Sequence, residues 1–377
     1  MRKMAARVLA LCTGAMLCFT PVSSRAEGLP AGPTTSAAGA VLMDVDTTRV
    51  LAASNAHQKL PMASTTKVMT ALLAVEHGDL DRLVTVPEEA YGIEGSSMYL
   101  NKGEKLSLRD LVYGLMLVSG NDAAVTIAKH VGGSVEGFIR MMNSRARELG
   151  CANTNFVTPN GLPDPDHYTT AYDLGLISAA AMKNKDFREI VAAQYHQTTT
   201  GDIKRTLKNK NKILWQYEGG NGVKTGFTKS AGRCLVFSAQ RDGHTIVGVV
   251  LNAPDMWNDA ISYLDSGFSS YEWKEMVQSG ETIQEVQVLH GMKNSFSAVA
   301  KRAILLRVAI KEGQQPQLRV QCIQQMEAPV LAGQAVGTLE AWLDGRMLAS
   351  TPLVAQETVL RKEYPYYVWQ LIQQWTA

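Results

Sequence analysis

The chain has 377 residues, of which 46% are hydrophobic and 19% are charged, and its formal net charge is +2. This is the balance of a globular protein with a sizeable core, and the length accommodates two domains. Without a strong basic excess, the composition argues against a nucleic-acid-binding protein.

The first 26 residues predict a cleaved secretory signal peptide. Three basic residues precede a short apolar run over 8–19, and Ser24-Arg25-Ala26 offers a small-residue cleavage site. The apolar run is shorter than the roughly 20 residues that a membrane-spanning helix needs. Removing residues 1–26 leaves 33 basic and 35 acidic residues, a formal charge of −2.

Strands and helices follow in blocks from 27 to 278. Ser64 opens a helix that Gly78 ends, and Ser107 begins a capping box. Asp242-Gly243 joins two β-rich runs as a hairpin. Strands that flank a helical block predict an α+β domain. The expected strands are 39–46, 49–52, 234–239 and 244–251, and the expected helices are 64–77, 111–118, 122–130, 134–149 and 256–273.

The chain changes character near residue 279. Short alternating runs separated by glycine-bearing turns predict a small all-β domain over 279–356. The tail, 357–377, has apolar residues at helical spacing and is rich in Trp and Tyr. Two interpretations stay open for it, an interfacial membrane anchor and a helix docked on its own domain. The expected strands here are 283–289, 303–310, 318–323 and 336–343.

Cysteine and histidine patterns bear on redox and metal chemistry. Beyond the signal peptide, Cys151, Cys234 and Cys322 are far apart and odd in number. They fit neither a disulfide framework nor a zinc site, so we predict three buried free thiols. The seven histidines form no metal-binding motif. We therefore expect no metal and no cofactor.

A first motif, Ser64-Thr65-Thr66-Lys67, places a hydroxyl and an amine on one face of a helix. A serine hydroxyl is a weak nucleophile that needs an adjacent base. A lysine serves as that base when burial and a second cation, here Lys224, lower its pKa. Taken alone, this motif is weak, and Ser64 would be read as a helix N-cap.

The second motif is Ser119-Gly120-Asn121, in a break between apolar helices. Ser119 is a candidate proton relay to a leaving amine, and Asn121 would hold Lys67 and the substrate backbone. By itself, the tripeptide is typical of a turn that stops a helix.

The third motif is Lys224-Thr225-Gly226. Lys224 offers positive charge to a substrate carboxylate, Thr225 offers a hydroxyl, and Gly226 allows close approach of a substrate backbone. The backbone N–H of Phe227 would join that of Ser64 in an oxyanion hole. On its own, this motif is typical of a solvated lysine before a turn.

The three motifs together are typical of penicillin-binding proteins and serine β-lactamases. Longer stretches resemble the low-molecular-mass penicillin-binding proteins, in particular the D-alanyl-D-alanine carboxypeptidases of the S11 peptidase family. The resemblance covers 37–275, and 280–355 is similar to the small β domain of that family. The stretches that carry it are 61–70, 118–123, 158–171 and 222–228 with Ala231-Gly232.

This resemblance implies a catalytic domain with an antiparallel sheet and a helical block, followed by the all-β domain. It implies that Ser64 attacks the terminal D-Ala-D-Ala bond of peptidoglycan stem peptides and that penicillin acylates the same serine. It also implies work on the cell wall and cell shape outside the cytoplasmic membrane, with peripheral attachment through the tail. Lys210 matches the position of a second basic residue for the terminal carboxylate.

Two further residues in the family-like loop, His167 and Asp173, are expected to hold the loop in place, because Lys67 already provides the base.

Three alternative functions stay open for the chain. A DD-endopeptidase would cut cross-links with the same site. A β-lactamase of class A would need aspartate at position 120 and a glutamate within 158–171, and the sequence has neither. A non-enzymatic wall-binding module would work through its β domain.

Overall fold

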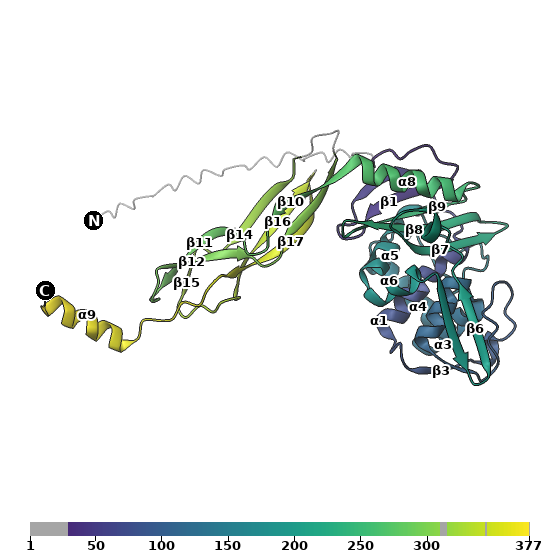
Figure 1. Cartoon of the computed structure of the whole chain (residues 1–377), viewed down its shortest axis with the longest axis horizontal. Helices are drawn as coiled ribbons and strands as arrows, with labels where there is room; N and C mark the ends of the chain where they lie inside the picture. The colour runs from purple at the N-terminus through teal and green to yellow at the C-terminus, as the bar shows by residue number, and fades with distance from the viewer. Residues whose placement is uncertain (1–28, 310–314, 344, 377) are drawn as a thin grey trace, which may run out of the picture.

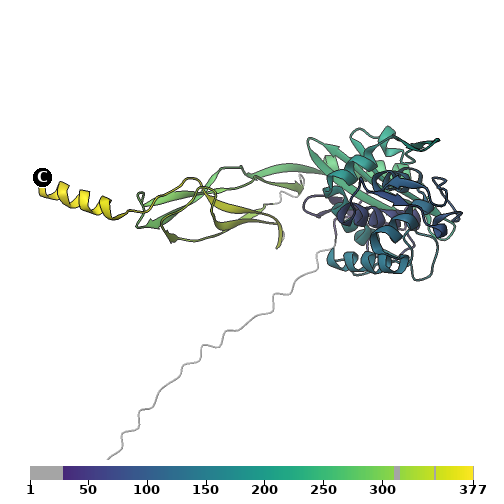
Figure 2. The ribbon, with the colours of Figure 1, turned by 90° about the horizontal axis from the view of Figure 1, so that it is seen from below.

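The computed structural model describes residues 29–309, 315–343 and 345–376, and the predicted signal peptide lies outside this part of the chain. A mixed helical and β domain occupies one end of an elongated molecule, and a slender β domain extends from it (Figure 1). Helix α9 (Tyr364–Thr376) lies at the far end of the β domain in both views (Figure 2).

A five-stranded antiparallel sheet, in the order β2-β1-β9-β8-β7, forms the centre of the N-terminal domain. The predicted hairpin is confirmed: Asp242 (φ 51°) and Gly243 (φ 78°) form the tight turn, with positive φ as its geometry requires. The strands are β1 (Gly39–Asp44), β2 (Val50–Ser54), β7 (Gly220–Thr228), β8 (Gly232–Arg241) and β9 (His244–Leu251).

Each face of this sheet is covered by helices. Successive side chains of a strand point to opposite faces. Thus Ala40 and Leu42 share a core with α8 (Met256–Ser270), whereas Val41 and Met43 pack into the helical block. The sheet therefore separates two cores, and its edge strand β7 borders the helical block.

The helical block contains four of the predicted helices, 64–77, 111–118, 122–130 and 134–149, together with α5 and α6, which were not predicted. Gly78 ends α1, and Ser107 Oγ accepts a hydrogen bond from Asp110 N at 3.0 Å, which confirms the predicted cap. The predicted helix 111–118 is α2 followed by a π-helical turn, η3. The helices are α1 (Lys67–His77), α2 (Leu108–Tyr113), η3 (Gly114–Val118), α3 (Asn121–Gly132), α4 (Val135–Glu148), α5 (Ala171–Lys183) and α6 (Lys185–Ala192).

Several short elements of the N-terminal domain were not predicted. The hairpin β5–β6 is polar and threonine-rich, so its alternation gives little signal. The added elements are η1 (Ala63–Thr66), η2 (Glu88–Ala90), α7 (Ile213–Gln216), β3 (Leu83–Thr85), β4 (Lys105–Ser107), β5 (Tyr195–Thr200) and β6 (Ile203–Lys208).

The end of the predicted helix 256–273 was wrong. Helix α8 ends at Ser270, and β10 (Tyr271–Val277) follows it and pairs with β13 (Ile304–Ala309). The hydroxyl of Tyr271 donates to Leu51 O at 2.7 Å, so the start of β10 is held by the N-terminal domain. The predicted boundary between residues 278 and 279 falls at the end of this connecting strand.

The C-terminal domain contains a six-stranded sheet among its described residues, in the order β14-β16-β17-β12-β11-β15. All four predicted strands are present. Strands β12, β15 and β17 were missed along with β10. The bounds are β11 (Thr282–Leu289), β12 (Ser295–Ala300), β14 (Gln317–Cys322), β15 (Gln325–Glu327), β16 (Ala335–Leu343) and β17 (Arg346–Ala355).

The tail forms a helix whose described apolar side chains are exposed. Trp375 is 89% exposed, and Trp369, Leu371 and Ile372 are more than half exposed. This exposure does not fit a helix docked on its own domain. Within the described ranges, no helix combines the length and the apolar character needed to cross a bilayer.

The three cysteines beyond the signal peptide are free thiols. Cys151 and Cys234 are buried, as predicted. Cys322 is only half-buried, so the prediction of a core thiol was wrong there. It ends β14, a strand whose side chains are otherwise exposed.

Candidate active site

Ser64 lies in the 3-10 turn η1, immediately before α1 and against β7. A Cβ atom at position 226 would lie 3.1 Å from both Ser64 N and Met62 O. Glycine at 226 therefore lets β7 approach the turn closely. The turn has no side-chain capping bond, so interpreting Ser64 as a helix N-cap was wrong.

Lys67 is completely buried beneath Ser64. Its Nζ lies 2.9 Å from Ser64 Oγ, 2.7 Å from Asn121 Oδ1 and 2.6 Å from Asn160 O. Burial, and then the charge of Lys224, lower the pKa of Lys67 well below its usual value. The amine of Lys67 is therefore desolvated and lies within hydrogen-bond distance of the Ser64 hydroxyl group.

Ser119 and Asn121 occupy the break between η3 and α3. Ser119 adopts a left-handed conformation (φ 68°, ψ 35°), which is costly for a residue other than glycine. Its Oγ is buried and has no hydrogen-bond partner among the described residues. Asn121 Nδ2 donates to Glu94 O at 2.6 Å, which orients its Oδ1 toward Lys67.

Lys224 is buried in the middle of β7, and its Nζ donates to Thr225 O at 2.9 Å. Burial and the nearby charge of Lys210 lower the pKa of Lys224 to about 7. Lys210 Nζ donates to Val118 O at 3.0 Å. The two lysines are therefore close enough to share one electrostatic environment.

These residues meet at a cleft of about 490 Å³. Of the predicted site residues, Lys67, Asn121 and Lys224 lie beneath its surface, and the others line it. The lining residues are Ser64, Ser96, Ser119, Lys210, Thr225, Gly226, Phe227, Arg233, Met256 and Trp257.

Sequence reasoning missed several of these positions. Asn160 belongs to a family-like stretch, but nothing in the sequence assigns its carbonyl to Lys67. The next residue, Gly161, has φ +82°, and a Cβ there would lie 2.0 Å from Ala63 O. Arg233 reaches the cleft because it pairs with Phe227 across β7 and β8. Only the folded sheet brings that pairing about.

The loop residues His167 and Asp173 have structural roles, as predicted. His167 Nδ1 accepts from Val157 N at 3.0 Å, so Nε2 carries the proton and donates to Thr66 Oγ1 at 2.7 Å. Burial lowers the pKa of His167 to about 4 and keeps it neutral. Asp173 Oδ2 accepts from Asn153 N at 2.7 Å.

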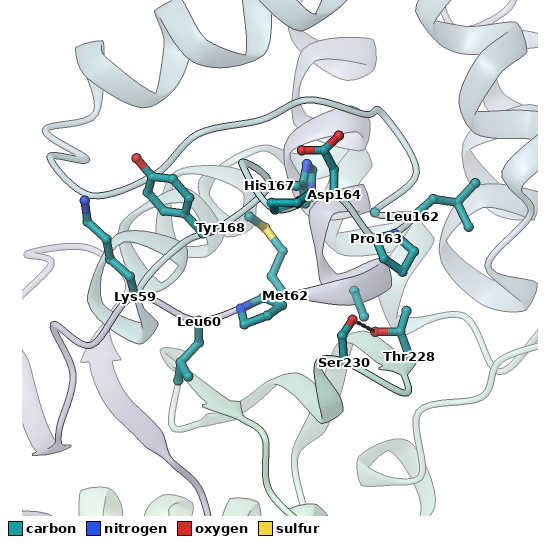
Figure 3. A pocket seen from close by; sticks show the side chains of 14 residues that line it. Lys59, Leu60, Met62, Leu162, Pro163, Asp164, His167, Tyr168, Thr228 and Ser230 are labelled. Carbon is teal, nitrogen blue, oxygen red and sulfur yellow. Dashed lines mark hydrogen bonds between the residues drawn. The ribbon is translucent and has the colours of Figure 1, made fainter.

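A second pocket of about 490 Å³ lies beside the segment that precedes Ser64 (Figure 3). Met62 and Leu162 contribute apolar surface, and Thr228, at the end of β7, lies across from them. The same strand therefore leads from the cleft toward this pocket, which we call the loop pocket.

A serine hydroxyl beside a buried lysine amine, with a second hydroxyl and a second buried lysine, is the arrangement of side chains that a serine acyl-transfer site needs. Comparison with known protein families supports the same class of enzyme. Residues 26–255 match the D-alanyl-D-alanine carboxypeptidase family, peptidase S11, and residues 271–361 match the penicillin-binding protein 5 C-terminal domain. The chain belongs to the S11 family of D-alanyl-D-alanine carboxypeptidases.

Individual relatives cover most of the chain. It is 32% identical to D-alanyl-D-alanine carboxypeptidase DacF of Bacillus subtilis, over 90% of each protein. Its structure resembles penicillin-binding protein 5 of Haemophilus influenzae, with TM-score 0.68, 32% identity, and coverage of 88% and 99%. The Streptomyces K15 DD-transpeptidase matches with TM-score 0.60 and 35% identity, over 63% of this chain and 99% of that one.

Proposed function

We propose that this protein removes the terminal D-alanine from peptidoglycan stem peptides through an acyl-enzyme at Ser64. The observation that carries the proposal is the buried contact of 2.9 Å between Lys67 Nζ and Ser64 Oγ. A neutral lysine amine has two N–H bonds and one lone pair. Asn121 Oδ1 and Asn160 O accept hydrogen bonds from the two N–H groups. The lone pair of the amine is then left to accept the proton of the Ser64 hydroxyl group.

Ser119 is the proposed proton relay to the departing amine. Its Oγ is buried, lacks a partner among the described residues and borders the cleft. Burial, and then the charge of Lys224, lower the pKa of Lys67, which favours its neutral form. The carbon–nitrogen bond breaks, the amine gains a proton, and the acyl group stays on Ser64.

Recognition is assigned to β7 and the residues around it. Thr225, with Lys210 and Arg233, is suited to the terminal carboxylate of the substrate, and arginine offers a bidentate contact. Backbone N–H groups of Ser64 and Phe227 would hold the developing oxyanion. The peptide that precedes the scissile bond would follow β7 toward Thr228 and the loop pocket.

Water then hydrolyses the ester and releases the shortened peptide. The family also binds β-lactams, which would acylate Ser64 in the same way. Glycine at position 120 and the absence of glutamate from 158–171 favour slow release of penicillin over β-lactamase activity.

The decisive experiment is intact mass spectrometry of the protein with benzylpenicillin, beside Ser64→Ala. We expect a stable single adduct that is absent from the variant. Release of D-alanine from a peptide ending in D-Ala-D-Ala should follow the same pattern. If penicillin leaves no adduct and stays intact, the wall-binding module becomes the better interpretation. If penicillin is destroyed without an adduct, the β-lactamase does.

Export and attachment complete the proposal. The signal-like residues 1–26 would direct the chain across the cytoplasmic membrane. Helix α9 would then hold it at the outer surface, because its exposed Trp369, Ile372 and Trp375 suit the headgroup region of a bilayer.

A further inference from the structure

A segment without regular secondary structure, residues 94–100, borders the active-site cleft through Ser96. We call it the rim segment. Its backbone belongs to no helix or sheet, so its N–H and C=O groups need partners elsewhere. Met98 and Leu100 are buried, whereas Tyr99, between them, is 83% exposed. Because Ser96 forms part of the cleft wall, the groups that hold this segment help to shape the site.

The carboxylate of Asp122, in the first turn of α3, holds the rim segment. This residue is buried, with an exposed fraction of 2%. Its Oδ2 accepts from Ser97 Oγ at 2.6 Å and from Leu100 N at 3.1 Å, and its Oδ1 accepts from Met98 N at 3.1 Å. Hydrogen bonds to a charged acceptor are stronger than those between neutral groups. One side chain therefore fixes the segment at three positions.

The contacts of Asp122 differ from those of an ordinary acidic residue in the first turn of a helix. Such a residue commonly accepts from the free N–H groups of its own helix and favours the macrodipole. Among the described contacts of this carboxylate, one donor belongs to α3, Ala123 N at 2.9 Å, and three belong to the rim segment. Within the described part of the chain, Asp122 forms no salt bridge. Its contacts are therefore directed at the wall of the cleft.

Two glycines leave room for this arrangement. A Cβ atom at position 120 would lie 2.7 Å from Asp122 Oδ1, which is shorter than a van der Waals contact. A Cβ atom at position 95, where φ is +94°, would lie 2.9 Å from Asn121 Nδ2. The aspartate that a class A β-lactamase needs at position 120 would therefore collide with the carboxylate that holds the rim segment.

Asn121 connects the rim segment to the base. Its backbone N–H donates to Ser96 O at 2.7 Å, and its Nδ2 donates to Glu94 O at 2.6 Å. Its Oδ1 accepts from Lys67 Nζ at 2.7 Å. The orientation of this amide thus depends on where the rim segment lies, and Asp122 fixes that segment.

We infer that Asp122 is a positioning residue for acylation, which holds the rim segment so that Asn121 presents its Oδ1 to Lys67 beside Ser64. The inference rests on the proposed function of the cleft. The described hydrogen bonds of the Asp122 carboxylate reach neither Ser64 nor Lys67. It would therefore act through Asn121 and through its charge, without touching the reacting atoms.

The charge of Asp122 gives this role a measurable effect on pH dependence. Burial lowers the pKa of Lys67, and the charge of Lys224 lowers it further. The charge of Asp122 raises that pKa, whereas the charge of Lys210 lowers it. His167 also faces the amine and stays neutral, because burial lowers its own pKa to about 4. Removing the negative charge should lower the pKa of Lys67, so that the neutral amine persists to lower pH.

The test measures the rate of acylation by a fluorescent penicillin across acidic and neutral pH, for the wild type and Asp122→Asn. Asparagine keeps the shape of the side chain but replaces one acceptor oxygen with a donor, which loosens the rim segment. We expect the plateau rate to fall about tenfold to hundredfold, the cost of misplacing a group near the reacting atoms. The acid limb of the profile should move to lower pH, which loosening alone would not produce.

A second variant and a control separate geometry from charge. Ser97→Ala removes one hydrogen bond to Asp122 and no charge, so it should slow acylation about threefold and leave the acid limb in place. The matched control is Asp44→Asn, which neutralises a buried carboxylate that accepts from Thr47 N at 2.8 Å, away from the residues that line the cleft. We expect a lower thermal midpoint for this control and acylation within about twofold of the wild type.

Each outcome decides the assignment. If Asp122→Asn acylates like Asp44→Asn, Asp122 has no positioning role. A slower plateau with an unmoved acid limb also overturns the inference, because loosening alone then accounts for the loss. If Asp122→Asn does not fold, Ser97→Ala decides: a threefold loss supports the inference, and wild-type acylation overturns it. Failure of the wild type to form an adduct at Ser64 would overturn the proposed function instead.

Discussion

The two domains bury different kinds of side chain. The N-terminal domain buries Lys67 and Lys224 completely, close to the hydroxyl group of Ser64. The C-terminal domain packs an apolar core, and among its described residues Thr351 is the only buried polar side chain. Burying a charge costs folding free energy, so such a group persists where it performs another task. The contrast places the candidate active site in the N-terminal domain.

The largest expected effect comes from removing the buried charge of the first domain. Lys67→Met keeps the volume of the side chain but removes the base. Acylation by a fluorescent penicillin should slow about 10²-fold to 10⁴-fold, the range typical of a lost general base. The thermal midpoint should stay level or rise, because an apolar side chain replaces a buried amine. Normal acylation of Lys67→Met would exclude the proposed base.

The next effect concerns the exposed helix at the far end of the second domain. Replacing Trp369, Ile372 and Trp375 with serine removes three of the large exposed apolar side chains of α9. Sedimentation with anionic phospholipid vesicles should then fall to the level of a chain truncated before residue 364. Penicillin acylation in solution should be unchanged. Equal sedimentation of the variant and the wild type would refute the anchor.

A cavity in the C-terminal domain should show whether the stability of that domain affects acylation at Ser64. Leu339 is fully buried in β16, and Leu339→Ala should destabilise that domain by about 3 kcal/mol. We expect an earlier unfolding step in calorimetry, with acylation by penicillin unaltered below that temperature. Leu72→Ala, in the core of the first domain, is the matched comparison and should move the other step. A shared shift would mean that the domains unfold as one unit.

The smallest expected effect is a pH dependence of stability. The pKa of Lys224 is about 7 in the folded protein and near 10.5 in the unfolded chain. Between these values the unfolded chain holds the extra proton, so stability rises with pH in this window. Lys224→Met lacks the penalty, and its advantage in thermal midpoint should shrink from pH 7 to pH 9.5. An advantage that is constant with pH would contradict the lowered pKa.

Some features followed from local sequence because their physical causes are local. Short apolar runs identified β1, β8 and β9, and the turn at Asp242-Gly243 predicted the hairpin of β8 and β9. The spacing of Ser64 and Lys67 placed both on one face of a helical turn. By contrast, β5 and β6 were missed because their alternating side chains are mostly polar. The end of α8 was missed because aromatic residues suit helix and strand alike.

The sequence by itself determined the three motifs, the helical and β-rich blocks and the resemblance to one peptidase family. Tertiary structure decided what these residues do to one another. It brought Asn160 O, 93 positions away, onto the amine of Lys67, and it buried Lys224 deeply enough to lower the pKa of both lysines. It also brought Lys210 and Arg233 to the edge of the cleft. Desolvation and charge proximity depend on distances through space, which the spacing of residues along a chain does not encode.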